Sequence, residues 1–206
     1  MAIESVMQET RVFQPPKAFA EKARLGSMTA YQAMCKDAEE NDAEYWAKHA
    51  RQEISWKKPF TRALDESNAP FYKWFDDGLL NVSYNCLDRH LENGNADKVA
   101  LIFEADGGEV TRVTYRDLYH RVCRLANAIK AMGYKKGDRV LIYMPMSVEG
   151  VVAMQACARL GLIHSVVFGG FAASELAVRI DDCTPKAIIA ASCARGKPQL
   201  SAAAVL

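Results

Sequence analysis

The stretch "RVLIYMPMSVEGVVAMQACARLGLIHSVVFGGF", residues 139–171, contains the pattern that decides the fold. Its segments 139–145 and 163–168 are continuous apolar runs, which predict strands that are covered on both faces. Between them, Ser147 can cap a helix that ends at Gly161. The apolar side of that helix carries Val151, Val152, Met154, Cys157 and Leu160. A strand, a helix and a second strand in this order indicate a parallel βαβ unit with a right-handed crossover.

The segments on either side of this unit continue the alternation. Residues 99–105 predict a strand, and "DGGE" at 106–109 predicts a hairpin turn that leads into a partner strand. "TYRD" at 114–117 has the form of a capping box in front of a helical stripe. After the βαβ unit, 173–180 has a helical pattern, and 186–191 is again a short apolar run that predicts a strand.

The predicted fold class is α/β: the start of a doubly wound, mostly parallel sheet with helices on both faces, preceded by a helical and irregular N-terminal extension. Helices are expected near 115–132 and 147–160, with Leu125 and Val152 as core positions. We expect a single sheet in which the last three strands are parallel, formed by strands near 99–105, 139–145, 163–168 and 186–191.

The first 92 residues have a different character. Residues 1–26 are expected to form an extended arm, and a helical pattern begins at Ser27. A later helical stripe consists of Tyr84, Leu87 and Leu91. Cys86 and His90 have the i, i+4 spacing of some metal ligands, but no second pair completes a site, so we expect them to serve packing.

Composition excludes several classes of protein. Lys and Arg number 26 and Asp and Glu number 25, and a net charge of +1 leaves no electrostatic footprint for nucleic acid. The six cysteines form no C-x-x-C pair, and the N-terminus lacks the basic and apolar stretches of a signal peptide. No apolar run approaches the ~20 residues of a membrane span. We therefore expect a cytoplasmic protein with reduced thiols and no membrane partner.

The glycine pair in "FGGF", 168–171, is a candidate binding loop, because ligands of open α/β sheets bind at the carboxyl ends of the strands. Glycine also lets a ligand approach the backbone. The local sequence favours a tight turn equally, since G-x-G-x-x-G and G-x-x-x-x-G-K-[ST] are both absent. "ARGK" at 194–197 is expected at the same edge, where its two cations can meet a phosphate or simply face solvent. His164 lies within an apolar run and is expected to be a core histidine.

Three longer stretches are more specific than any single motif. Residues 74–91, 111–146 and 151–171 closely resemble the N-terminal third of the acetyl-CoA synthetase family, the AMP-forming acid–CoA ligases of the adenylate-forming superfamily. The resemblance extends over about residues 1–192. It implies a two-step reaction, in which ATP and acetate give acetyl-adenylate and pyrophosphate with the help of Mg²⁺. The thiol of CoA then attacks the adenylate, which gives acetyl-CoA and AMP.

The same resemblance assigns a ligand to the glycine pair. The family's Phe-Gly-Gly borders the CoA nucleotide, and a basic Arg-Gly-Gly loop after the next strand lies against the CoA phosphates. Here the basic loop lacks at least one glycine. The CoA-binding residues that the resemblance implies are Phe168, Gly169, Gly170, Arg195, Gly196 and Lys197. It implies no catalytic residue and no metal site in this chain.

The family's ATP loop, acyl pocket and C-terminal domain correspond to nothing in these 206 residues. We therefore expect an N-terminal fragment that is inactive alone and binds ATP, CoA and Mg²⁺ weakly at best, with acetate, ATP and CoA as partners of the complete enzyme. The alternatives are a propionate–CoA ligase fragment and a non-catalytic CoA- or nucleotide-binding module. The expected parts are an arm, 1–26, the family's N-terminal extension, 27–92, and the first part of the AMP-binding large domain, 93–206.

Overall fold

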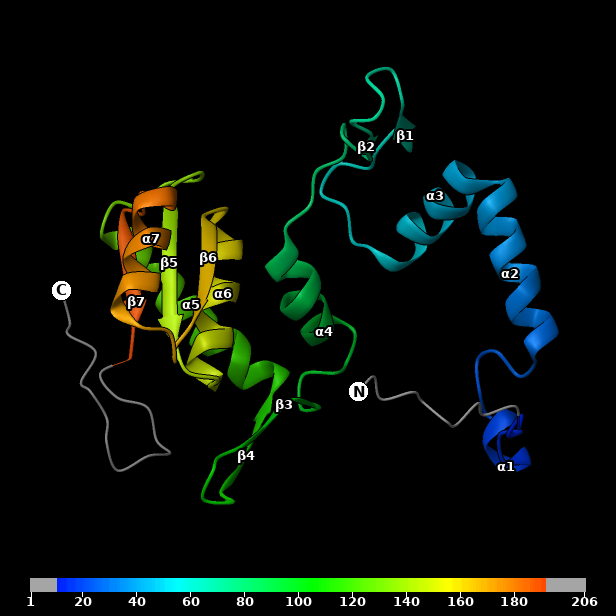
Figure 1. Ribbon diagram of the computed structural model, residues 1–206, viewed down its shortest axis with the longest axis horizontal. Helices are drawn as coiled ribbons and strands as arrows, with labels where there is room; N and C mark the ends of the chain where they lie inside the picture. Colours follow the sequence, from blue (N-terminus) through cyan, green and yellow to red (C-terminus); the bar gives the residue numbers. More distant parts are fainter. Residues whose placement is uncertain (1–10, 192–206) are drawn as a thin grey trace, which may run out of the picture. The chain divides into compact units, whose positions relative to one another are not determined.

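A computed structural model describes residues 11–191 of the chain (Figure 1). These residues divide into two compact units. One unit consists of residues 11–53 and 62–76, and the other consists of residues 54–61 and 77–191. No helix of the described residues is both long enough and apolar enough to cross a membrane.

The first unit is mainly helical. Its elements are α1 (Lys17–Ala20), α2 (Met28–Glu40), α3 (Asp42–Glu53) and the short antiparallel strands β1 (Leu64–Asp65) and β2 (Lys73–Trp74). The hydroxyl of Ser27 accepts a hydrogen bond from the backbone N–H of Ala30 at 3.1 Å, so the helical pattern begins where the sequence predicts. One helical turn, α1, lies within the segment that was expected to be an extended arm.

The second unit is built on a three-stranded parallel sheet. Its strands are β5 (Arg139–Met144), β6 (Ile163–Phe168) and β7 (Ala187–Ala190), in the order β6-β5-β7. The register places Val140 of the central strand beside His164 on one side and Ala187 on the other. The expectation that the last three strands are parallel is confirmed.

The hairpin does not belong to this sheet. Strands β3 (Val99–Glu104) and β4 (Val110–Thr114) pair only with each other, in a separate antiparallel sheet. The prediction of one sheet that includes 99–105 is therefore wrong. The physical reason is that β4 runs directly into α5 (Tyr115–Ala131), so the hairpin packs its apolar side chains on the core and satisfies its backbone internally.

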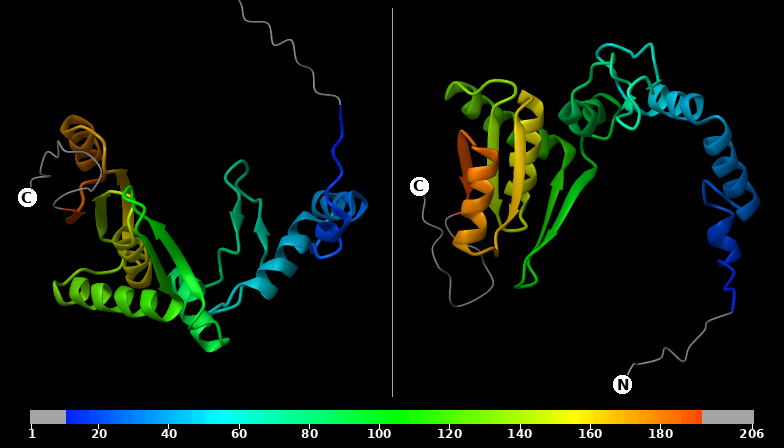
Figure 2. Two further views of the ribbon diagram at one scale, coloured as in Figure 1. Left: turned by 90° about the horizontal axis from the view of Figure 1, so that it is seen from below. Right: turned by 45° about the horizontal axis from the view of Figure 1, so that its top comes forward.

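Helices cover both faces of the parallel sheet, as the predicted fold class requires. Helices α5 and α6 (Val148–Leu160) lie on one face, and α7 (Ala173–Cys183) lies on the other (Figures 1 and 2). The main core lies between α5, α6 and the sheet and includes Val122, Ile129, Val140, Ile142 and Val152. Val152 is 8% exposed, so it is a core position as predicted, whereas Leu125 is only partly buried at the edge of this core.

Local signals set the helix ends in this unit. The hydroxyl of Thr114 accepts from the N–H of Asp117 at 3.1 Å and donates to its carboxylate at 2.8 Å. The Ser147 hydroxyl accepts from the N–H of Gly150 at 3.1 Å, which caps α6. Gly161 ends α6 with a φ of 70°, a left-handed conformation that favours glycine.

The stretch before the hairpin forms a short helix with an unusual start. A π-helical turn, η1 (Tyr84–Asp88), continues into α4 (Arg89–Glu92), and Leu87 of this turn is 2% exposed in the core. The ring of His90 lies 4.7 Å from that of Tyr115, so the histidine serves packing, as expected.

Candidate functional site

The strand order places a ligand crevice at the carboxyl ends of β5 and β6. The chain leaves β5 toward α6 on one face of the sheet and leaves β6 toward α7 on the opposite face (Figure 1). Adjacent strands whose connections diverge in this way form a topological switch point, where open α/β sheets bind ligands. The predicted binding loop, Phe168–Gly169–Gly170–Phe171, begins at the end of β6, directly at this switch point.

Neither glycine of this loop has a positive φ, so space rather than backbone conformation decides which side chains the two positions tolerate. A Cβ atom at Gly169 would lie 2.9 Å from the carbonyl carbon and oxygen of Met144 and from the nitrogen of Pro145. Because these are backbone atoms, they cannot move aside, and residue 169 must lack a side chain. A Cβ at Gly170 would lie 2.6 Å from a ring carbon of Phe168. The N–H of Phe171 donates to the carbonyl of Phe168 at 3.1 Å, so the loop is a tight turn.

Aromatic rings and a cation surround this turn. The rings of Phe168 and Phe171 are 5.8 Å apart, edge to face, and Phe168 remains 60% exposed. The guanidinium of Arg179 lies 4.7 Å from the centre of the Phe171 ring and forms an ion pair with Glu175 at 3.1 Å. The Tyr143 hydroxyl donates to the carbonyl of Phe171 at 2.9 Å, which holds the turn on the central strand. An exposed ring beside a guanidinium can stack on a base and attract a phosphate.

The second predicted part of the site lies outside the described residues. Arg195, Gly196 and Lys197 follow Ala191, the last residue that the structure describes. Strand β7 is parallel to β5, so its carboxyl end, and the connection that follows it, begin at the same edge of the sheet as the glycine turn.

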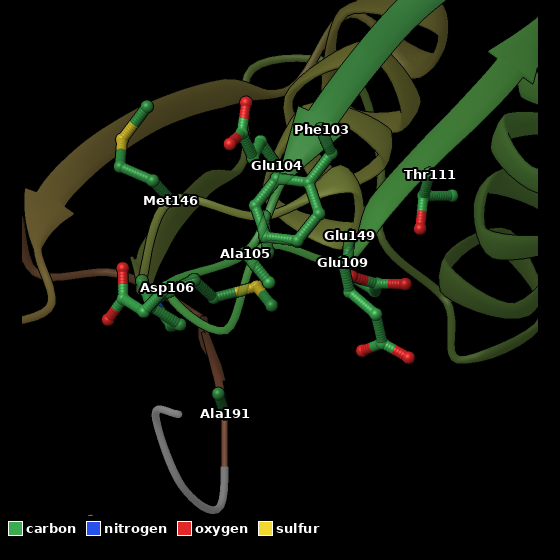
Figure 3. Close-up of a pocket in the computed structure, with 12 residues that line it drawn as sticks. Phe103, Glu104, Ala105, Asp106, Glu109, Thr111, Met146, Glu149 and Ala191 are labelled. Carbon is green, nitrogen blue, oxygen red and sulfur yellow. The ribbon is translucent and has the colours of Figure 1, made fainter. Parts of the chain in front are cut away.

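A pocket of about 740 Å³ lies at this edge, between the β3–β4 hairpin and the connection from β5 to α6. Figure 3 shows the Phe103 ring in its centre and the side chains of Met146 and Thr111 at its sides. Four carboxylates line it, from Glu104, Asp106, Glu109 and Glu149. Sequence reasoning missed this pocket, because "DGGE" signals only a turn and nothing in the pattern places the hairpin beside residues 144–149.

The acidic pocket is not a metal centre. Among residues 11–191, no three His, Cys, Asp or Glu side chains are grouped so that they could hold a metal ion. A second, smaller pocket of about 360 Å³ is lined by Ser55, Trp56, Lys57, Asn81 and Tyr84, away from the strand ends.

Two titratable groups of this unit, one half-buried and one in the main core, have shifted pKa values. Burial lowers the pKa of His164, so this half-buried imidazole is more readily kept neutral, as fits a packing role. Burial also raises the pKa of the Cys157 thiol to about 11, so the thiolate is scarce at neutral pH. Neither side chain is therefore prepared to act as a charged nucleophile or a strong base.

Two sequence models of known families together match residues 31–205 of the chain. Residues 87–205 match the sequence model described as AMP-binding enzyme. The chain belongs to the AMP-binding enzyme family. Residues 31–86 match a second model, described as the acetyl-coenzyme A synthetase N-terminus. The AMP-binding match includes the sheet, the glycine turn and the acidic pocket, and the boundary between the two matches falls within η1.

Curated relatives within this family share most of the chain. A protein of Cupriavidus necator named acetyl-coenzyme A synthetase is 67% identical over 190 residues, which are 92% of this chain and 29% of the relative. Proteins of the same name from Ralstonia pickettii and Thiobacillus denitrificans are 64% and 63% identical over 189 and 190 residues, with the same coverage. The chain thus spans 29% of the length of these relatives.

Proposed function

We propose that this chain forms the N-terminal part of an AMP-forming acetate–CoA ligase. The complete enzyme would join acetate to CoA through acetyl-adenylate, with ATP, CoA and Mg²⁺ as its cosubstrates and cofactor. The observation that carries this proposal is the 67% identity, over 190 residues, to a relative named acetyl-coenzyme A synthetase. We also propose that the protein is cytoplasmic and that its substrates are small molecules.

The contribution of this chain to that reaction is one wall of the CoA site. Phe168, Gly169 and Gly170 would border the CoA nucleotide, with the exposed Phe168 ring available for stacking. The shape of the turn supports this role, because the backbone at Gly169 lies directly against the end of β5. Arg195, Gly196 and Lys197 would meet the CoA phosphates from the connection after β7.

The residues described here do not fit Mg²⁺, since they include no group of three candidate ligands. Four carboxylates in the neighbouring pocket would also repel a nucleotide's phosphates. We therefore assign the adenylation step to parts of the enzyme other than residues 11–191. No observation on these residues favours either alternative, a propionate–CoA ligase fragment or a non-catalytic binding module.

A chimaera tests the proposal. Residues 1–191 would replace the matching residues of the Cupriavidus necator relative, and two activities would be measured: acetate-dependent pyrophosphate exchange and acetyl-CoA formation. We expect the rates of both activities to lie within about tenfold of those of the relative, and a tenfold difference corresponds to about 1.4 kcal/mol. The 206-residue chain alone should show neither activity. A chimaera that folds and lacks both activities would contradict the proposal, and so would robust exchange by the chain alone.

A further inference from the structure

The glycine turn passes into α7 with little local support from that helix. Residue 172, which precedes α7, is an alanine, so its side chain cannot cap the helix as Thr114 and Ser147 cap α5 and α6. No residue of α7, within 173–183, is buried. The attachment of the turn to α7 therefore depends on side chains that reach back from the helix.

Arg179 of α7 makes such a contact. Its guanidinium lies over the Phe171 ring, 4.7 Å from the ring centre, at the last residue of the glycine turn. Nη1 donates to the backbone carbonyl of Glu175 at 2.7 Å and to its carboxylate at 3.1 Å, so two oxygens of one residue hold the guanidinium in place. A cation fixed over an aromatic ring attracts that ring and restricts its orientation.

The Phe171 ring in turn contacts the ring of Phe168. The two ring centres are 5.8 Å apart, and the ring planes are nearly perpendicular, at 81°. The Phe168 ring also lies against Gly170, because one of its carbon atoms would be 2.6 Å from a Cβ at that position. The Tyr143 hydroxyl holds only the backbone carbonyl of Phe171. The orientation of the two rings is therefore set from α7, by Arg179.

We propose that Arg179 is a positioning residue for the CoA nucleotide. It fixes the Phe171 ring, which holds the Phe168 ring in the orientation on which the nucleotide stacks. The inference rests on the proposed function, because the role of Phe168 at CoA is part of that proposal. Arg179 acts through the rings rather than on a phosphate, since the carboxylate of Glu175 already offsets its charge at 3.1 Å.

Steady-state kinetics of the chimaera test this role. Arg179→Ala should raise the KM for CoA about three- to tenfold, as expected for the loss of a partly exposed cation–π contact. The kcat and the rate of acetate-dependent pyrophosphate exchange should change by less than about twofold, because the substitution affects only CoA binding. Arg179→Lys keeps a cation near the ring and should recover part of the loss.

The matched control removes a guanidinium from a comparable ion pair elsewhere in the same unit. Arg116 pairs with Asp97 at 3.1 Å, the same distance as in the Arg179–Glu175 pair. Arg116→Ala should therefore leave the KM for CoA unchanged. An increase as large as that of Arg179→Ala would show a general effect of losing a surface arginine and would overturn the proposal, and so would an unchanged KM in Arg179→Ala.

Two comparisons separate positioning from direct phosphate binding. With 3′-dephospho-CoA, Arg179→Ala should raise the KM by the same factor as with CoA, whereas a contact with the 3′-phosphate would give no increase. In a Phe171→Leu background, Arg179→Ala should add less than about a twofold increase, because the ring through which it acts is gone. Fully additive effects of the two substitutions, or an effect confined to the 3′-phosphate, would overturn the proposal.

A measurement without CoA separates this inference from the proposed function. In the 206-residue chain with labelled phenylalanine, NMR should show nuclear Overhauser contacts between the rings of Phe168 and Phe171. Arg179→Ala should weaken these contacts, while Arg179→Lys and Arg116→Ala should keep them. If the parent chimaera is inactive, the proposed function is contradicted, and the ring contacts alone decide whether Arg179 positions the rings. Contacts that persist unchanged in Arg179→Ala overturn the proposal, and Arg179→Gln replaces that variant if it does not fold.

Discussion

Asp88 and Arg159 form a two-point ion pair that joins the end of η1 to the end of α6. The guanidinium Nη1 donates to Oδ1 at 3.1 Å, and Nη2 donates to Oδ2. The side chains are 22% exposed for Arg159 and 17% exposed for Asp88. Burial is the largest single effect and lowers the pKa of the Arg159 guanidinium, but the hydrogen bond with Asp88, the charge of Asp88 and smaller contributions from Cys123 and Tyr119 together raise it. The Asn81 amide adds hydrogen bonds to the carbonyls of Ala158 and Arg159, at 3.2 and 3.1 Å.

Asp88→Asn should destabilise the chain by about 1–3 kcal/mol, because it leaves a partly buried guanidinium without its counter-charge. Urea denaturation at pH 7 measures the free energy of unfolding. Asp97→Asn is the matched control, since the Asp97–Arg116 pair is exposed and should contribute less than about 1 kcal/mol. Equal losses for the two variants would mean that the Asp88 pair is no stronger than a surface pair.

The two glycines of the turn should respond differently to alanine. Gly169→Ala should cost about 1–3 kcal/mol, because its Cβ meets the backbone of Met144 and Pro145. Gly170→Ala should cost less than about 1 kcal/mol, since the exposed Phe168 ring can turn away. Thermal and urea melts of the 206-residue chain compare the two, and a larger loss at Gly170 would refute the assignment of the close approach to Gly169.

The CoA assignment predicts a separation of two activities. In the chimaera, Gly170→Val should lower kcat/KM for CoA by about tenfold or more, because a branched side chain fills the surface beside Phe168. Pyrophosphate exchange, which does not use CoA, should fall much less. An unchanged kcat/KM for CoA would remove Phe168, Gly169 and Gly170 from the proposed site.

The pair Asp138–Lys186 predicts a pH dependence. The Lys186 ammonium donates to Asp138 at 2.6 Å, and this bond, followed by the N–H of Lys135, lowers the pKa of the carboxyl group. A pKa lowered by folding stabilises the protein above the unfolded value of about 3.9, and this stabilisation is lost as the pH falls through the folded pKa. Asp138→Asn should therefore be less stable than the parent at pH 7, and the difference should vanish in strong acid. If the difference in free energy of unfolding between Asp138→Asn and the parent stayed constant from pH 7 to pH 2, this pH dependence would be contradicted.

Truncating one side chain on α5 and one on α6 compares how much each helix contributes to the main core. Val152→Ala should cost about 2 kcal/mol, because the side chain is 8% exposed in the main core. Leu125→Ala removes more atoms from a less buried position, so it should cost a similar amount. Val178→Ala, on the exposed side of α7, should cost less than about 0.5 kcal/mol. Urea denaturation measures the free energy of unfolding of each variant and so ranks the three losses.

Sequence reasoning succeeded where the determining contacts are local. The caps at Thr114 and Ser147 and the stop at Gly161 depend on neighbours within four residues, and the apolar run at β5 reports burial on both faces. The similar run at β6 is only partly buried. These signals were enough to predict that the last three strands are parallel and that the glycine pair follows the strand 163–168.

Sequence reasoning failed where residues that are distant in the sequence must meet. The residue types at 99–105 predict a strand but do not show which backbone that strand pairs with, so the hairpin was assigned to the wrong sheet. Asp88 and Arg159 are 71 residues apart, and no spacing rule connects them. The acidic pocket likewise exists only because the fold brings the hairpin turn beside Met146.

The order β6-β5-β7 has a consequence for the chain in isolation. Among residues 11–191, β6 and β7 each pair with β5 alone, so the outer side of each carries backbone donors and acceptors that are available to another strand. The β6 side also exposes Ile163 and Val166. Open sheet edges of this kind can pair with a strand of another molecule, so we expect the chain to self-associate in a concentrated solution.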